Sequence, residues 1–208
     1  MPLLRPLIAL AVAVAFSAST TAFAAGDAAR GKVLSYTCLG CHGIEDYRNA
    51  YPDYNVPRLA GQHADYIVAA LKEYKDGERQ HATMQVQAAT LSDQDMADIA
   101  AYFASQTTVK PEPSGAPVPA KVAQLCVACH GKDGVGVSAA YPSLASQHAS
   151  YLEKALDEYR SGERKNAIMG TFMPTLSAQD TATIADYYAG QSPGLKTLER
   201  RLTILSAR

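Results

Sequence analysis

Two five-residue stretches decide the fold: Cys38-Leu39-Gly40-Cys41-His42 and Cys126-Val127-Ala128-Cys129-His130. In each, the two cysteines stand three positions apart and a histidine follows the second one directly. On a helical turn this spacing places both thiols on one side, where they can add to the two vinyl groups along one edge of a haem. The histidine then directs its imidazole at the haem iron from the same side. The motifs predict two covalently attached haem c groups, held by Cys38, Cys41, Cys126 and Cys129.

Four cysteines also allow other chemistry. A dithiol redox pair normally lies in a thioredoxin-like βαβ unit, which this sequence lacks. A zinc site would need all four cysteines together, although each pair belongs to its own part of the chain. Two disulfides would be awkward at such short spacing and would leave the paired histidines unexplained. Haem attachment therefore remains the favoured interpretation.

The two motifs lie in an internal repeat. Residues 57–106 align with residues 142–191 at a constant offset of 85 positions, and 27 of the 50 aligned residues are identical. Each unit has about 80–90 residues, far more than the repeats that stack into solenoids. Prolines recur in the segment between the units and favour an extended connector. We therefore expect two sister domains, residues 25–109 and 120–192, joined by a Pro-rich linker at residues 110–119.

Each copy has the pattern of a helical protein. Short helices are expected at residues 27–36 and 120–125, and longer ones at 63–75 and 148–160. Ser92 and its counterpart Ser177 are expected to cap a last helix in each copy. One buried stripe at helical spacing follows the first of these caps, formed by Met96, Ile99, Ala100 and Phe103. No alternating run is long enough for a sheet, so the predicted fold class is all-α.

The N-terminus has the pattern of a cleaved secretory signal peptide, residues 1–24. Arg5 precedes an apolar stretch, and Ala22-Phe23-Ala24 provides small residues at the cleavage subsites. An uncleaved anchor is the alternative; otherwise the mature chain begins near Ala25 without a transmembrane segment. The formal net charge of -1, without basic runs, argues against nucleic acid as a partner.

An electron carrier needs a second protein ligand on each iron. The repeat alignment places Met84 and Met169 at equivalent positions, seven residues before the Leu-Ser that starts the last helix. A thioether is a soft ligand that favours reduced iron and raises its potential. The expected axial pairs are therefore His42 with Met84 and His130 with Met169. Met173, which precedes a proline as in many small cytochromes, is the alternative to Met169, and core packing is the alternative role for both aligned methionines.

Two further repeated pairs bear on the iron ligands. His63 and His148 could in principle replace methionine, but they stand at the start of a helix, where an entry or surface role is expected. The carbonyls of Pro57 and Pro142 are expected to accept the second N–H of the proximal imidazoles. Such a bond fixes the orientation and basicity of the ring.

Together these features resemble the dihaem class I c-type cytochromes, and the chain is identified as a member of the cytochrome c4 family. The resemblance covers the mature chain to about residue 192. It rests on both Cys-x-x-Cys-His motifs, on the Pro-x-Leu-Ala-(Gly/Ser)-Gln strings at 57 and 142, and on the Ile-Ala-x-Tyr strings at 99 and 184. It implies two cytochrome c folds packed as pseudo-twofold partners, with haem propionates near their interface. The basic tail, residues 193–208, departs from the family pattern and is expected to be either a short docking helix or a frayed terminus.

The resemblance implies a soluble periplasmic protein without catalytic residues, which carries single electrons within a respiratory chain towards a terminal oxidase. Its expected partners are redox proteins, namely an electron donor and a terminal oxidase or dehydrogenase, and peripheral membrane association stays open. Two other classes also stay open. One is the cytochrome subunit of a periplasmic dehydrogenase that oxidises sulfur compounds or alcohols. The other is a catalytic haem protein such as a peroxidase, which needs an open iron position.

Charge adds two expectations. Arg79 and Arg164 stand at equal positions before the two methionine segments, and they either pair with haem propionates or lie on the surface. Residues 25–109 carry 11 acidic and 7 basic residues, whereas residues 116–192 carry 7 and 6. A basic partner surface is therefore expected to dock on the first domain.

Overall fold

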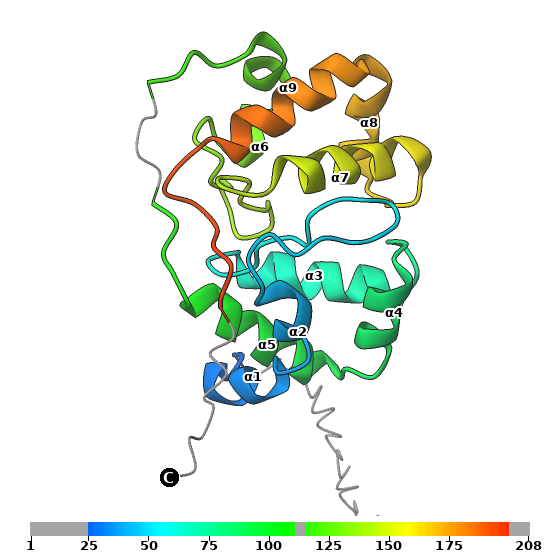
Figure 1. Cartoon of the computed structure of the whole chain (residues 1–208), viewed down its shortest axis with the longest axis vertical. Coiled ribbons are helices and arrows are strands. Elements are labelled where there is room, and N and C mark those ends of the chain that lie inside the picture. Colours follow the sequence, from blue (N-terminus) through cyan, green and yellow to red (C-terminus); the bar gives the residue numbers. More distant parts are fainter. Residues whose placement is uncertain (1–24, 111–114, 200–208) are drawn as a thin grey trace, which may run out of the picture.

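The computed structural model describes residues 25–110 and 115–199 (Figure 1). The expected signal peptide lies outside these residues, as do part of the linker and the end of the tail. Within the described ranges the elements are helices, and extended segments pair only through isolated β-bridges. The all-α prediction is confirmed. No helix among the described residues is long and apolar enough to cross a membrane.

The first half of the chain, residues 25–110, forms the lower body in Figure 1. Its helices are α1 (Ala28–Leu34), α2 (Leu39–His42), α3 (Ala64–Lys75), α4 (Ala82–Ala89) and α5 (Asp93–Ser105). Helix α1 packs closely on α5, because a Cβ on Gly31 would lie 1.9 Å from the carbonyl oxygen of Asp98. Only glycine therefore permits this approach. The core of this half lies between α3 and α5.

The second half, residues 115–191, repeats this order in the upper body of Figure 1. Its helices are the π-helix η1 (Val122–Cys126), α6 (Val127–His130), α7 (Ala149–Ser161), α8 (Ala167–Phe172), the 3-10 helix η2 (Met173–Thr175) and α9 (Ala178–Ala189). A separate core joins α7 to α9 and includes Tyr188, which is fully buried. The two halves thus have one core each.

The expected helix signals are present where the sequence places them. Ser92 and Ser177 both form complete capping boxes at the starts of α5 and α9. Gly162 caps α7 with a φ of 82°, the left-handed conformation that glycine adopts without strain. The stripe that begins with Met96 on α5 is buried, with Met96 itself 0% exposed. The short helices α4 and α8 lie in segments for which no helix was expected.

A set of paired hydrogen bonds joins the two halves about a pseudo-twofold axis. The Gln62 amide donates to the Ser143 carbonyl at 3.0 Å and accepts from the Ser143 backbone N–H at 2.9 Å. Its counterpart Gln147 makes the same two bonds to the backbone of Arg58, at 3.0 and 2.9 Å. Both glutamines are 4% exposed. Backbone groups of each half, buried at Ser143 and half-buried at Arg58, are therefore satisfied by a side chain of the other half.

The described part of the tail is neither helical nor frayed. It leaves α9 and runs back along the first half, as the red segment of Figure 1 shows. The Leu195 backbone N–H donates to the Ala145 carbonyl at 2.8 Å, and Lys196 pairs with Ala60 in an antiparallel bridge. Leu195 is only 1% exposed. Residues 192–199 therefore connect the second half to the first.

Candidate functional site

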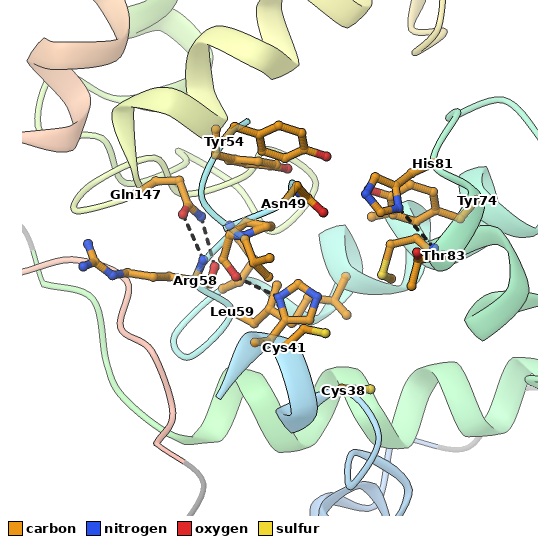
Figure 2. A pocket seen from close by; sticks show the side chains of 18 of the residues that line it. Cys38, Cys41, Asn49, Tyr54, Arg58, Leu59, Tyr74, His81, Thr83 and Gln147 are labelled. Carbon is orange, nitrogen blue, oxygen red and sulfur yellow. Dashed lines mark hydrogen bonds between the residues drawn. The ribbon is translucent and has the colours of Figure 1, made fainter. Parts of the chain in front are cut away.

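A cavity of about 450 Å³ lies in the first half, against its junction with the second half. Cys38, Cys41 and His42 line it, and so does Met84 from α4. Figure 2 shows the two cysteines on one side of this cavity, with Tyr74, His81 and Thr83 on the other side. The structure therefore brings the motif and the aligned methionine of this half to a common space.

The imidazole of His42 is held by the backbone. Its Nδ1 lies 2.8 Å from the Pro57 carbonyl oxygen, as the sequence predicts, which leaves Nε2 as the nitrogen available for a metal. Burial lowers the pKa of His42, and the bond to Pro57 acts in the opposite direction. The ring is thus favoured in the neutral form that binds iron.

A histidine caps the short helix α4, which contains Met84. His81 caps α4, because its Nδ1 accepts a hydrogen bond from the Met84 backbone N–H at 3.2 Å. The Tyr74 ring packs edge-on against His81, with centroids 6.4 Å apart. Asn166 takes the place of His81 in the second half and accepts from the Met169 N–H at 3.0 Å. The two methionines therefore stand at the same position of equivalent short helices.

The second half has a matching cavity of about 410 Å³. Cys126, Cys129, His130 and Met169 line it. The Nδ1 atom of His130 lies 3.0 Å from the Pro142 carbonyl oxygen, and burial lowers the pKa of this histidine too. The geometry around the proximal histidine is thus repeated.

The structure separates the competing candidates from the cavities. Met173 is 3% exposed and belongs to the core of the second half, and it is not among the residues that line the second cavity. His63 and His148 occupy the N-cap positions of α3 and α7 and line neither cavity. These placements agree with the helix-entry role expected for the two histidines.

The four cysteines form no disulfide with one another and are divided between the two cavities. Burial raises the pKa of the Cys126 thiol to about 11 and also raises that of Cys38. Among the described residues, the group whose side chains could jointly hold a metal ion is Glu45, Asp46 and His148. A zinc site built from all four cysteines is therefore incompatible with this fold.

Arg79 and Arg164 lie buried between the halves rather than on the surface, at 3% and 4% exposure. Each donates across the junction, from Arg79 to the Tyr151 hydroxyl at 2.6 Å and from Arg164 to the Tyr66 hydroxyl at 2.7 Å. Each guanidinium also stacks 4.5 Å from the ring centroid of a tyrosine of its own half. Sequence reasoning singled out these arginines but did not identify their partners in the opposite half.

These arginines also test whether the cavities suit a haem. Arg79 lines the first cavity and Arg164 the second, and the Nε atom of each is buried without a hydrogen-bond partner in the structure. Haem carries two propionate groups, whose carboxylates match a guanidinium N–H. The cavities also supply two thiols, an imidazole and a thioether each. The residues present therefore fit a haem, and Arg79 and Arg164 would be available to bind its propionates.

Comparison with known proteins agrees with this geometry. The sequence profile of the cytochrome c family, described as "Cytochrome c", matches residues 28–107 and 120–190. A curated cytochrome c4 of Pseudomonas aeruginosa is 39% identical over 189 residues, which cover 81% of this chain and 90% of that protein. The chain belongs to the cytochrome c4 family. As a member of this family it carries two covalently bound haem c groups and transfers electrons.

Two other similarities extend the comparison. The crystal structure of reduced recombinant cytochrome c4 from Pseudomonas stutzeri superposes with a TM-score of 0.66 at 33% identity, covering 80% of this chain and all of that one. A protein of Stutzerimonas stutzeri named thiosulfate dehydrogenase electron acceptor is 35% identical over 169 residues, which cover 73% of this chain and 77% of that protein. This cytochrome c4 family member is thus similar both to cytochromes c4 and to a protein named as an electron acceptor of thiosulfate dehydrogenase.

Proposed function

We propose that each half of the chain holds one haem c with the ligands of that half. Cys38 and Cys41 attach the first haem and Cys126 and Cys129 the second. The axial pairs are His42 with Met84 and His130 with Met169. The observation that carries this assignment is that each cavity is lined by the cysteine pair, the histidine and the methionine of one half.

The residues of each cavity have separate tasks in this assignment. When bound, haem supplies an iron that gains or loses one electron. The Pro57 carbonyl holds the His42 ring in one orientation, and the Pro142 carbonyl does the same for His130. The helix caps of α4 and α8 hold the methionines. Because both axial positions are then filled by protein, no position is left for a substrate.

The methionine assignment is tested with three alanine variants of the holoprotein. Met84→Ala and Met169→Ala should each remove the spectroscopic signature of methionine ligation from one haem and lower the potential of that haem. Met173→Ala is the matched control and should keep both signatures, since Met173 belongs to the core. Loss of a methionine signature in the Met173 variant alone would overturn the assignment of Met169.

We further propose that the protein works in the periplasm and carries electrons within a respiratory chain towards a terminal oxidase. The signal-peptide pattern of residues 1–24 supports export. The proposed domains, residues 25–109 and 120–192, contain the two segments that match the cytochrome c family. Residues 110–119 then act as the linker, and residues 193–208 form the tail.

A second candidate role is favoured by one specific similarity, the thiosulfate dehydrogenase electron acceptor of Stutzerimonas stutzeri. In this role the protein receives electrons from a periplasmic dehydrogenase of sulfur compounds. The two roles are distinguished by stopped-flow kinetics of the holoprotein with each partner. Rapid oxidation by a terminal oxidase without reduction by thiosulfate dehydrogenase supports the respiratory role. Rapid reduction by thiosulfate dehydrogenase, or co-purification with it, supports the acceptor role.

A further inference from the structure

The junction between the halves is almost symmetric, but one charged position breaks the symmetry. Glu73 on α3 and Glu158 on α7 are equivalent in the repeat. Glu158 is 6% exposed and lies 3.5 Å from the ammonium group of Lys154, one turn earlier on the same helix. The residue equivalent to Lys154 on α3 is Ala69. The first half therefore retains the carboxylate, which is half-buried at Glu73, but lacks the lysine beside it.

The Glu73 carboxylate accordingly lacks the lysine partner that Glu158 has. Its Oε2 atom is buried and has no hydrogen-bond partner in the structure. No ion pair among the described residues joins Glu73 to a lysine, arginine or histidine. One oxygen of the half-buried carboxylate is thus held away from water without a partner, and its negative charge acts on whatever occupies the neighbouring space.

That neighbouring space belongs to the other half. Glu73 and Ala69 line the second cavity, together with Tyr159 and Arg164. Burial raises the pKa of Tyr159, Arg164 acts in the opposite direction, and the Glu73 carboxylate makes a smaller contribution to the rise, so a negative charge lies near this ring. A residue of the first domain thus brings a negative charge to the haem site of the second.

The equivalent charge at the first cavity has a cation beside it. Burial, and next the Glu158 carboxylate, raise the pKa of Tyr54 to about 12, and Tyr54 lines the first cavity. Glu158 therefore lies close to the first haem site, much as Glu73 lies close to the second. Its partner Lys154 also contacts Glu163 at 3.1 Å and is 24% exposed. Lys154 thus offsets part of the negative charge of Glu158 and Glu163 near the first cavity, whereas no lysine among the described residues offsets that of Glu73 at the second.

We propose that Glu73, a residue of the first domain, tunes the haem of the second domain. Its negative charge lowers the reduction potential of that haem. Reduction of a haem removes one positive charge from the iron, so a nearby negative charge favours the oxidised form. The effect is large where the surroundings are buried and weakly screening. Because Lys154 has no counterpart at Ala69, the second haem is affected more than the first. In the half-reduced protein the electron is then shifted towards the first haem. This inference rests on the proposed placement of one haem in each cavity.

The test is an equilibrium redox titration of the two-haem protein, in which NMR signals of each haem assign the two potentials. Glu73→Gln removes the charge and should raise the potential of the second haem alone. The electron partition between the haems should then change about threefold to tenfold, and a tenfold change corresponds to about 59 mV for a one-electron couple. Asp65→Asn is the matched control, since Asp65 is an exposed carboxylate on the same helix. It should leave the partition unchanged.

A reciprocal pair of variants keeps the test independent of how well Glu73→Gln folds. Ala69 is exposed, so Ala69→Lys introduces the missing cation at a site with room for it and should raise the potential of the second haem. Lys154→Ala removes the existing cation and should lower the potential of the first haem. The role of Glu73 is refuted if Glu73→Gln and Ala69→Lys leave the partition unchanged, or if both haems shift equally. Absence of two one-electron steps in the parent protein would instead contradict the proposed function.

Discussion

The substitution Gln62→Leu tests how the two halves are held together. Gln62 makes two hydrogen bonds to the Ser143 backbone, at 3.0 and 2.9 Å, although the two residues are 81 positions apart. Ser143 is 1% exposed, so water cannot replace the lost partner without opening the junction. Leucine keeps a similar side-chain volume but offers neither a donor nor an acceptor.

The expected cost is counted from the two buried Ser143 backbone groups; the half-buried His63 N–H, which donates to the Gln62 side chain at 3.0 Å, loses its partner as well. A buried donor or acceptor without a hydrogen bond costs about 1–3 kcal/mol. Two such groups, partly offset by the better burial of a leucine side chain, give a loss of roughly 2–4 kcal/mol. In a chain of about 150–250 residues this lowers Tm by about 4–16 °C. Gln147→Leu should cost a similar amount, because Gln147 makes the same pair of bonds to Arg58.

The assay is thermal unfolding of the holoprotein followed by circular dichroism, with Gln124→Leu as the matched control. Gln124 is exposed on η1, so its replacement should shift Tm by no more than about 1–2 °C. Gln62→Leu and Gln147→Leu together should cost less than the sum of the single variants, because each opens the same junction. A Tm for Gln62→Leu equal to that of the control would show that these bonds do not hold the halves together.

Three further predictions concern helix ends and the charged surface. Ser92→Ala removes the capping box of α5 and should destabilise the protein by about 0.5–2 kcal/mol in thermal unfolding, with unchanged haem spectra. The pKa of Asp95 is lowered from 3.8 to about 2. The largest cause is the hydrogen bond from the Ser92 hydroxyl, and the Ser92 backbone N–H and Arg30 contribute next. Because the pKa of Asp95 is lower in the folded state than in the unfolded state, its charge stabilises the fold above about pH 4, and this stabilisation is lost as the pH falls towards 2. The free energy of unfolding of Asp95→Asn, measured against pH, should lack this loss. Neutralising Asp46, Asp53 and Asp65 should weaken the salt dependence of reduction by a basic redox partner, and an unchanged dependence would refute docking on the first domain.

The parts of the structure that depend on neighbouring residues could be predicted from sequence. The capping boxes at Ser92 and Ser177 require residues three positions apart, and both form. The bond from His42 to the Pro57 carbonyl spans only 15 positions and follows a pattern that the repeat shows twice. The internal repeat also predicted that the chain divides into two similar halves, because identical residues at a constant offset occupy equivalent places.

The contacts across the junction could not be predicted, because they join residues far apart in the chain. Gln62 and Gln147 are identical in the repeat, yet that identity does not reveal that each binds the backbone of the other half. The same holds for Arg79, whose tyrosine partner lies 72 positions away. Helices α4 and α8 have only 8 and 6 residues, too few for a clear hydrophobic period. The path of the tail depends on backbone contacts with Ala145 and Ala60, which lie far away in the chain, so it has no local signal.

The central claim, that both irons are held between a histidine and a methionine and serve only to carry electrons, is tested most directly by carbon monoxide. The native protein is reduced anaerobically and mixed with carbon monoxide while the haem absorption spectrum is followed. With both axial positions filled from the two cavities, neither haem should bind carbon monoxide rapidly. Rapid formation of the carbon monoxide complex at either haem would show an open iron position and contradict the account.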